Sequence, residues 1–455
     1  MSSNISTQTI TVLGAGYVGL TTAALLAHCG YKIYLIEPNK ERLDVIKTGR
    51  SFFFEEGIDP VIKLAIDAGD LIPTDSYEEA IPESDVVFSC VGTPDNPDGS
   101  SNLSYVFSAA EETAKFAKAD VIYVQKSTVP VGTGIKVQEV FKTAKKRIKY
   151  VSNPEFLREG TAVYDTLYFD RVVVGGDDKK AVDAVLDIYF TLERYRDHIA
   201  HVARVPNGPR GDQYIATSLN SAELIKVTSN AFLALKISFA NSIAMLADKA
   251  GADVVEVMDA VGADNRIGRA FFNAGRGYGG GCFPKDVSGL ISSGLEYGVD
   301  LEIMQAAQTQ NRLMPGYVVD KLQDTLEGQL TGKKVAVLGL AFKAGTSDVR
   351  KSPAVAIANK LIEAGATVST YDPQANEEAA PDLHDNVRQF ETIEETIEKA
   401  DAVIIATEWS ELLQYPAELL AQHMKGKILL DAVNQYDAVE ASSAGLTYLG
   451  VGHNV

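Results

Sequence analysis

A glycine-rich turn directly after the first apolar segment constrains the fold of this chain more than any other feature. Residues 9–13 have the pattern of a short strand, the run Gly14-Ala15-Gly16-Tyr17-Val18-Gly19 follows at once, and a helix rich in alanine and leucine continues to about residue 28. Gly14 permits the tight turn, Gly16 lets a pyrophosphate approach the backbone, and Gly19 lets the helix pack close to the sheet. The spacing predicts a Rossmann-like nucleotide-binding unit, and a purely structural glycine turn is the alternative.

A carboxylate at the end of the second expected strand supports the nucleotide-binding interpretation. This strand covers residues 32–36 and ends at Glu37, eighteen residues past Gly19. A carboxylate at this place accepts hydrogen bonds from a ribose 2′-hydroxyl and repels a 2′-phosphate. The pattern therefore favours NAD over NADP as the cofactor.

The alternation of strands and helices continues after this unit. Residues 85–92, 121–127 and 171–176 are apolar segments, each followed by turn or helix signals. Thr93 and Thr128 come just after two of these strands, at the sheet edge that faces the ligand in doubly wound folds. A helix cap or a turn position is the alternative for both threonines.

The second half of the chain predicts a helical segment and then another α/β unit. Residues 220–250 read as one long helix, whose apolar surface pairs with a second copy of the chain or is buried within it. Strand-like segments follow at 331–340, 366–371, 402–407 and 427–430. Bulky residues follow Gly339 where a dinucleotide turn needs glycine, so a mononucleotide or sugar-nucleotide site fits better there. We expect an α/β protein in which two Rossmann-like doubly wound domains (1–205 and 326–455) are joined by a central helical domain (206–325).

Composition excludes several classes of partner. A net charge of -19 argues against nucleic acid and anionic membranes, which need a basic surface. We expect that no apolar run approaches the roughly 18 residues of a membrane span. The N-terminus lacks the basic and apolar regions of a signal peptide, so we expect a cytoplasmic protein. Three well-separated cysteines and six scattered histidines predict neither a disulfide framework nor a metal site.

The glycine-rich run at residues 275–286 predicts a reactive thiol. Five glycines lie among residues 275–281, Cys282 follows them, and Pro284 favours a first helical turn just after the cysteine. The amides of a helix N-terminus and the nearby Lys285 stabilise a thiolate, the form that attacks carbonyl groups. A buried structural cysteine is the alternative.

Three polar pairs share a spacing of four residues: Glu155 with Glu159, Lys226 with Asn230, and Cys282 with Asp286. In a helix, each pair would lie on one face, one turn apart. A solvated helix face is the alternative for each pair taken alone.

Together these residues resemble the UDP-glucose/GDP-mannose dehydrogenase family over nearly the whole chain. The matching stretches are 14–19, 126–130, 153–160, 222–226 with Asn230, 277–286 and 340–350. The resemblance implies an NAD-binding domain, a central dimerisation domain and a UDP-binding domain. It also implies oxidation of UDP-glucose to UDP-glucuronate with two NAD, by a homodimer or a larger homo-oligomer.

The resemblance further implies roles for individual residues. Cys282 is the nucleophile that forms a thiohemiacetal and then a thioester, Lys226 and Asn230 stabilise the oxyanion, Asp286 and Thr128 serve proton transfer, and Glu155 assists hydrolysis of the thioester. Glu159 is a further catalytic residue, near the sugar and the nicotinamide. Arg266 reaches a neighbouring subunit's sugar site, and Lys343 contacts substrate. The other implied positions fall into two groups. The cofactor-binding residues are Gly14, Gly16, Tyr17, Val18, Gly19, Glu37, Thr93, Thr128, Glu159, Lys285 and Arg350. The substrate-binding residues are Glu155, Phe156, Leu157, Lys226, Asn230, Arg266, Tyr278, Gly279, Phe283, Phe342 and Lys343.

The chain departs from the family's pattern at three places, and three alternatives for its function stay open. Gly281 stands where the family usually has serine, Glu56 stands where it has proline, and the stretch 194–217 is longer than expected, as a surface loop or a lid. The alternatives are the same chemistry on GDP-mannose, UDP-N-acetylglucosamine or UDP-N-acetylmannosamine, a non-catalytic sensor of NAD and nucleotide sugars, and a two-electron hydroxyacid dehydrogenase.

Overall fold

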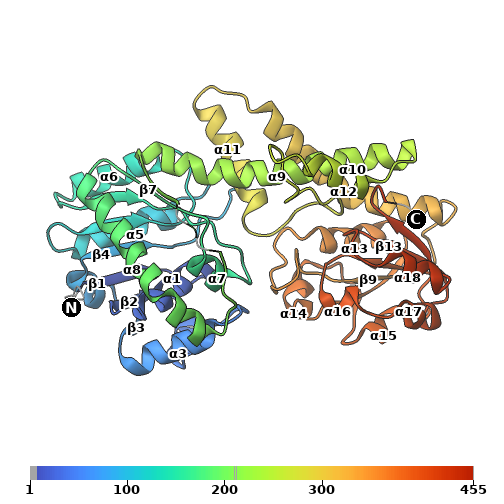
Figure 1. The fold of residues 1–455 in the computed structure, drawn as a ribbon, viewed down its shortest axis with the longest axis horizontal. Coiled ribbons are helices and arrows are strands. Elements are labelled where there is room, and N and C mark those ends of the chain that lie inside the picture. The colour runs from blue at the N-terminus through green and yellow to red at the C-terminus, as the bar shows by residue number, and fades with distance from the viewer. Residues whose placement is uncertain (1–7, 210, 212, 454–455) are drawn as a thin grey trace. The chain divides into compact units, whose positions relative to one another are not determined.

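The computed structural model describes residues 8–209, 211 and 213–453, and the chain divides into two compact units, Met1–Ser229 and Asn230–Val455. Each unit contains one parallel or nearly parallel sheet with helices on both faces (Figure 1). The predicted fold class, two Rossmann-like α/β parts with a long helix between their sheets in sequence, is confirmed.

The first unit is built on an eight-stranded sheet with the order β3-β2-β1-β4-β5-β6-β7-β8. All neighbours are parallel except β6 and β7. Because the chain moves outward from β1 in both directions, the carboxyl ends of β1 and β4 meet at the point where the order reverses, which is the ligand crevice of such sheets. The strands are β1 (Thr9–Leu13), β2 (Lys32–Ile36), β3 (Leu71–Thr74), β4 (Val86–Ser89), β5 (Ile122–Gln125), β6 (Lys149–Ser152), β7 (Arg171–Gly176) and β8 (Gln213–Thr217).

Helices cover both faces of this sheet and form two separate cores. Ile10 and Val12 of β1 face one core and Leu13 faces the other, as the alternation of a strand buried on both sides requires. The first core lies under α1 (Tyr17–Ala27), α3 (Ile58–Ala68), α7 (Ala162–Leu167) and α8 (Lys179–Ala203). The second lies under α4 (Tyr77–Ala80), α5 (Ser104–Phe116) and α6 (Thr133–Thr143), and α2 (Lys40–Lys47) follows β2.

The expectation of a long loop or lid at 194–217 is wrong. The last turns of α8 occupy this stretch up to Ala203, and β8 begins at Gln213 and pairs with β7. Between them, the described residues 204–209 and 211 form no helix or strand, and Arg210 and Asp212 lie outside the described residues. The stretch extends the helix and the sheet because its apolar residues, such as Ile199, pack into the first core.

The second unit begins inside the long helix α9 (Leu219–Ala250) and contains a six-stranded parallel sheet. The strand order is β11-β10-β9-β12-β13-β14. The strands are β9 (Lys334–Leu338), β10 (Thr367–Tyr371), β11 (Arg388–Gln389), β12 (Ala402–Ile405), β13 (Ile428–Asp431) and β14 (Thr447–Gly450). The order about β9 repeats that about β1, so this unit also has a switch point where β9 and β12 end.

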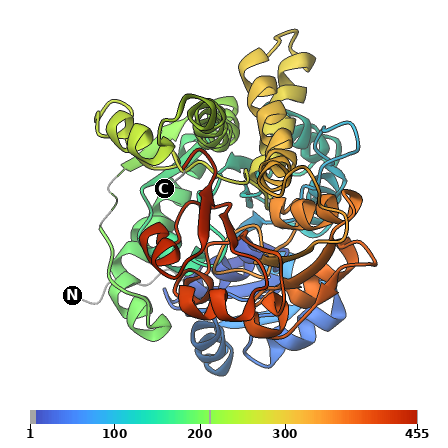
Figure 2. The same cartoon turned by 90° about the vertical axis from the view of Figure 1, so that its right-hand side faces the viewer.

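Helices from two parts of the sequence cover this second sheet. One face packs against α10 (Val254–Gly262), α12 (Glu302–Thr325), α13 (Pro353–Glu363) and the last turns of α9. The other face packs against α15 (Ile393–Ile397), α16 (Ser410–Leu413), α17 (Ala417–His423) and α18 (Ala438–Ser443), while α14 (Asn376–Ala379) follows β10. Helix α11 (Phe283–Glu296) turns back on α12 to form a hairpin, seen at the top of Figure 2.

The expectation that no apolar run is long enough to cross a membrane does not hold for helix α9. By length and composition alone it qualifies, and 44% of its most apolar window is buried inside the structure. Core helices of soluble proteins pass the same test, because a helix buried on several sides is apolar around most of its circumference.

Candidate functional site

The turn between β1 and α1 has the properties that a pyrophosphate site requires. Gly14 has a φ of +88°, and a Cβ there would lie 3.0 Å from the carbonyl oxygen of Cys90. A Cβ on Gly19 would overlap the Gly14 carbonyl oxygen, whereas a Cβ on Gly16 would meet no atom within 4 Å. The three glycines therefore serve the turn, the helix packing and an open approach for a ligand, in the order the sequence predicts.

Glu37 is held at the end of β2 beside this turn. Its Oε2 accepts a hydrogen bond from the amide of Ala15 at 3.1 Å, and its Oε1 accepts one from the amide of Asn39 at 2.9 Å. Each carboxylate oxygen has a second lone pair, so the group can still accept hydrogen bonds from a ribose. The residues of this turn fit an NAD molecule.

The second unit has a similar turn after β9, but its residues leave no room for a dinucleotide. The Gly14 amide donates to Ile36 at 2.8 Å, and the corresponding Gly339 amide donates to Tyr371 at 2.7 Å. Asp372 then takes the place of Glu37, but its two oxygens accept five hydrogen bonds. The donors are the amides of Leu340, Ala341, Gln374 and Ala375 and the indole Nε1 of Trp409.

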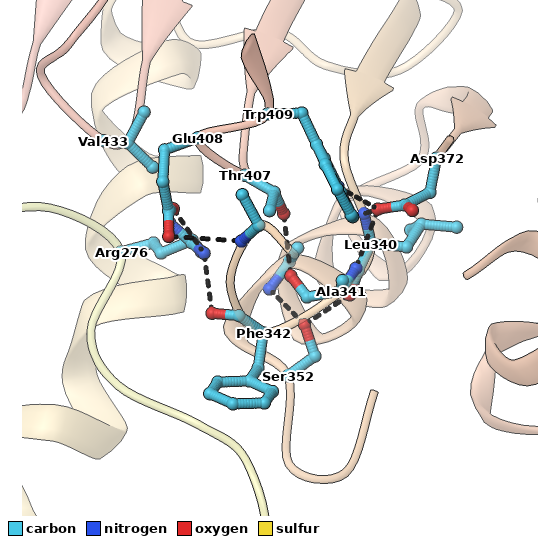
Figure 3. Close-up of polar contacts among 12 residues, drawn as sticks. Arg276, Leu340, Ala341, Phe342, Ser352, Asp372, Thr407, Glu408, Trp409 and Val433 are labelled. Atoms are coloured by element: carbon cyan, nitrogen blue, oxygen red, sulfur yellow. Dashed lines mark hydrogen bonds and ion pairs between the residues drawn. The ribbon is translucent and has the colours of Figure 1, made fainter. Parts of the chain in front are cut away.

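Asp372 therefore has no capacity for a ribose, because a carboxylate offers about four lone-pair positions. It is 2% exposed, and Leu340 and Ala341 are fully buried where Gly16 leaves open space in the first unit. Figure 3 shows Asp372 and Trp409 on one side of the loop that follows β9. The expectation that this turn is not a second dinucleotide site agrees with this geometry.

A second set of contacts fixes the rest of that loop. Arg276 donates from Nη2 to the carbonyl of Phe342 at 2.8 Å and pairs with Glu408, which also accepts the amide of Ala344 at 3.3 Å (Figure 3). Arg276 is 5% exposed, so this is a buried connection between the glycine-rich run and the loop after β9. The contacts hold Phe342 and its neighbour Lys343, two of the predicted substrate contacts, in a fixed loop.

The glycines of residues 277–281 pack directly against the same loop. A Cβ on Gly280 would lie 2.8 Å from the ring of Phe342, and one on Gly281 would lie 2.5 Å from the guanidinium carbon of Arg350. The Gly280 amide donates to the carbonyl of Arg350 at 2.8 Å. The second unit thus brings together predicted site residues from two segments about 60 residues apart in sequence.

Cys282 lies where the sequence predicts it, as the N-cap residue of α11 with Pro284 in the first turn. Its side chain is exposed, which disagrees with the alternative of a buried structural cysteine. The Asp286 amide donates to the Cys282 carbonyl at 2.8 Å, so the predicted helical spacing of this pair is confirmed. A helix N-terminus stabilises a thiolate, which favours reactivity at this position.

Asp286 forms a hydrogen-bonded group with two other predicted residues. It is 3% exposed, and it accepts a hydrogen bond from Asn230 Nδ2 at 2.6 Å and from Lys285 Nζ at 2.7 Å. Lys285 was predicted to bind the cofactor, and in the structure its ammonium group donates to Asp286. A carboxylate held by two donors is oriented for proton transfer near Cys282.

Lys226 and Glu155 form a buried ion pair in the first unit. Lys226 Nζ lies 2.9 Å from Glu155 Oε1, and both side chains are nearly inaccessible. Burial alone raises the pKa of Glu155, but the Lys226 ammonium and the Leu157 amide outweigh it and leave that pKa below its ordinary value. Glu155 is therefore ionised at neutral pH and balances the lysine's charge.

Glu155 and Glu159 do not lie on a helix, so they do not share a helix face. Residues 153–158 have no regular secondary structure, and a turn at Glu159 and Gly160 follows. Pro154 and the hydrogen bond from the Leu157 amide to the Glu155 carboxylate replace the backbone bonds that a helix would make. Lys226 and Asn230 do lie one turn apart on α9, as predicted.

The predicted site residues divide between the two units. The second unit contains the predicted positions from Asn230 onward. The first contains the turn at Gly14–Gly19, Glu37, Thr93, Thr128, Glu155, Phe156, Leu157, Glu159 and Lys226. Two residues of the second unit that were predicted to contact substrate make contacts within the protein instead. Tyr278 is buried and packs edge-on against Phe283 with ring centroids 6.0 Å apart, and the exposed Arg266 pairs with Asp264.

Three buried polar groups near the site were missed by the sequence interpretation. Lys126 donates to the hydroxyl of Tyr189 at 2.7 Å, which donates to Asn153 at 2.5 Å. Glu55 accepts the amides of Gly160 and Val163, and Glu223 accepts those of two residues at the start of α6. Only the Lys-Ser-Thr run at 126–128 carried a sequence signal, because acidic side chains such as those of Glu55 and Glu223 are ordinarily exposed.

The fold and this set of contacts define a class of protein: an α/β protein with an open dinucleotide turn, a closed second turn and an exposed thiol at a helix N-terminus. Sequence models of the UDP-glucose/GDP-mannose dehydrogenase family match in three segments. The NAD binding domain matches residues 8–193, the central domain 220–313 and the UDP binding domain 336–438. The chain belongs to the UDP-glucose/GDP-mannose dehydrogenase family.

Individual relatives cover almost the entire chain. The UDP-glucose 6-dehydrogenase YwqF of Bacillus subtilis is 38% identical over 97% of this chain and 97% of its own length. A UDP-glucose dehydrogenase structure from Pyrobaculum islandicum is 36% identical, with a TM-score of 0.89 over 100% of this chain and 99% of that one. A UDP-D-ManNAc dehydrogenase structure from Pyrococcus horikoshii is 26% identical, with a TM-score of 0.84 over 98% and 99%.

Proposed function

We propose that this protein oxidises the primary alcohol of UDP-glucose to the carboxylate of UDP-glucuronate, using two molecules of NAD. The observation that carries the proposal is the exposed Cys282 at the N-terminus of α11, one turn before an Asp286 held by Asn230 and Lys285. Four-electron oxidation needs a nucleophile, because an aldehyde can release a second hydride only after it becomes tetrahedral. A thiolate supplies that step.

Each proposed step has a residue to perform it. NAD, when bound, accepts one hydride in each of the two oxidations. The alcohol proton passes to Asp286 with the help of Thr128 and a water, and the Cys282 sulfur then bonds to the aldehyde carbon. Lys226 and Asn230 stabilise the oxyanion that forms. After the second oxidation leaves a thioester, water adds to its carbon with help from Glu155, and the thiolate leaves as the carboxylate forms.

The binding roles follow the three segments of the chain. We propose that the domains at 1–205, 206–325 and 326–455 bind NAD, mediate dimerisation and bind the UDP moiety, and the matched ranges of the family models support these boundaries. The open turn at Gly16 and the carboxylate of Glu37 support NAD binding in the first. The fixed loop with Phe342 and Lys343 supports nucleotide-sugar binding in the third.

The proposal includes a homodimer in the cytoplasm. Phe232, Phe239 and Leu246 are spaced by seven residues on α9 and are 58%, 47% and 62% exposed, so they form one apolar stripe. A second copy of the chain would cover this stripe and would bring Arg266 to its neighbour's sugar site. Phe239→Asp should then convert the dimer into a monomer in size-exclusion chromatography, and a dimer that survives this change would contradict the role of the stripe.

A panel of nucleotide sugars tests the substrate assignment. We expect NADH formation with UDP-glucose at a kcat/KM at least about 100-fold above that with GDP-mannose, UDP-N-acetylglucosamine or UDP-N-acetylmannosamine, because a site matched to substrate hydroxyls discriminates strongly. A higher kcat/KM with UDP-N-acetylmannosamine would instead favour the activity of the Pyrococcus horikoshii relative.

NADP should be a poor cofactor, since Glu37 repels a 2′-phosphate. Glu37→Ser should reduce the difference in kcat/KM between NAD and NADP.

A further inference from the structure

Glu223 connects helix α9 to the loop that carries Thr128. Its Oε2 accepts the amide of Gly132 at 2.7 Å and its Oε1 accepts the amide of Gly134 at 2.8 Å. These amides belong to the start of α6, so the carboxylate takes two donors that the helix itself leaves unsatisfied. Glu223 is 2% exposed and lies three residues before Lys226 on the same helix.

The segment that holds Thr128 is fixed at both of its ends. On one side, Ser127 donates its hydroxyl to the carbonyl of Val91 at 2.7 Å, which ties it to the end of β4. On the other side, Thr133 donates its hydroxyl to the carbonyl of Pro130 at 2.6 Å, and Glu223 holds the glycines on either side of Thr133. Glu223 lies outside this segment and fixes the end of it that follows Thr128.

The packing around Gly134 makes this contact specific. A Cβ on Gly134 would lie 2.6 Å from Tyr150 Cε1, 2.8 Å from Leu219 Cδ2 and 3.0 Å from Glu223 Oε1. The glycine therefore leaves room for the carboxylate to reach both amides. A side chain at residue 134 would have to displace the side chain of Tyr150, Leu219 or Glu223.

We propose that Glu223 is a positioning residue for the reaction: its carboxylate holds the start of α6 and thereby keeps Thr128 in place for proton transfer. The inference rests on the proposed function, in which Thr128 helps to carry the proton of the alcohol. It adds a connection between α9, which supplies Lys226, and the Thr128 segment.

The contact depends on the charge of the carboxylate. Burial raises the pKa of Glu223 to about 7, while hydrogen bonds from Gly134, Gly132 and Thr133 lower it. The phenol of Tyr150 on β6 also faces this carboxylate. Above pH 7 both oxygens accept amide hydrogens, whereas below it one oxygen carries a proton and opposes a donor. Turnover should therefore fall as the pH falls below about 7.

Glu223→Gln tests the inference, because the amide keeps the shape but presents an NH₂ group to one of the two backbone donors. We expect kcat for UDP-glucose to fall on the order of 10-fold or more, as displacement of a catalytic group predicts, with unchanged dissociation constants for NAD and UDP-glucose. The acidic limb of the kcat profile near pH 7 should disappear. Glu139→Gln removes an exposed carboxylate from the same helix α6 and should leave kcat and the pH profile unchanged.

A double-mutant cycle with Thr128→Val separates positioning from a general loss of structure. If Glu223 acts through Thr128, Glu223→Gln should cost little further activity in the Thr128→Val background. A full additional loss there would overturn the positioning role and leave the proposed function intact. If Thr128→Val alone keeps the parent rate, the role proposed for Thr128 is wrong, and the inference about Glu223 fails with it.

Discussion

Cys282→Ala should abolish oxidation of UDP-glucose while leaving ligand binding intact. We expect turnover to fall by at least about 1,000-fold, as is typical when a catalytic nucleophile is removed. The dissociation constants of NAD and UDP-glucose should stay near those of the parent, because glycines form the open turn at Gly14–Gly19 and Arg276 holds the loop after β9. Steady-state kinetics and calorimetric titration measure the two effects separately.

The reactivity of the thiol provides an independent check of this variant. Burial raises the pKa of Cys29 and of Cys90 to about 12, so neither thiol should react quickly near neutral pH. Cys282 is exposed at a helix N-terminus and should account for the fast alkylation by iodoacetamide. Cys282→Ser should stall as an ester adduct, visible by mass spectrometry, because an ester hydrolyses more slowly than a thioester. Parent-like turnover by Cys282→Ala would show that the cysteine is only structural.

Lys226→Met should cause the second large loss. The change removes a proposed oxyanion donor, which costs roughly 100- to 1,000-fold in kcat. It also leaves Glu155 buried without its ion-pair partner, so the variant should lose about 3 kcal/mol of stability at pH 7. Because the ammonium holds the pKa of Glu155 down, that pKa should rise above its ordinary value in the variant.

Two comparisons keep this prediction open to contradiction. Lys249→Met removes an exposed charge from the last turn of the same helix and should leave both kcat and the melting temperature close to the parent values. Glu155→Gln with Lys226→Met should restore stability, because neither charge of the ion pair remains, but it should not restore kcat. A stable Lys226→Met variant with parent-like turnover would contradict both the ion pair's importance and the oxyanion role.

Local patterns predicted the parts of the fold and site that depend on neighbouring residues. The turn at Gly14–Gly19, the carboxylate of Glu37 and the helix start at Cys282 follow from backbone sterics and capping, which short segments contain. The difference between the two nucleotide turns was also visible, because bulky residues follow Gly339.

Long-range contacts were not predictable in the same way. The closure of the second turn depends on Trp409 reaching Asp372 across 37 residues, and the support of the Thr128 loop depends on Glu223 reaching Gly132 across 91. The sequence interpretation of 194–217 as a loop was wrong because the packing of Ile199 and the pairing of β8 are decided by the rest of the unit. Similarly, Glu155 and Glu159 have helical spacing, but Pro154 and a local side-chain contact prevent the helix.

The ratio of NADH formed to UDP-glucose consumed tests the central claim most directly. Complete conversion of a limiting, known amount of UDP-glucose with excess NAD should give two NADH per substrate, with UDP-glucuronate as the product and no free aldehyde at any time. The reason is that the intermediate stays bonded to Cys282 between the two oxidations. A ratio of one, or an aldehyde that can be trapped in solution, would contradict the four-electron mechanism.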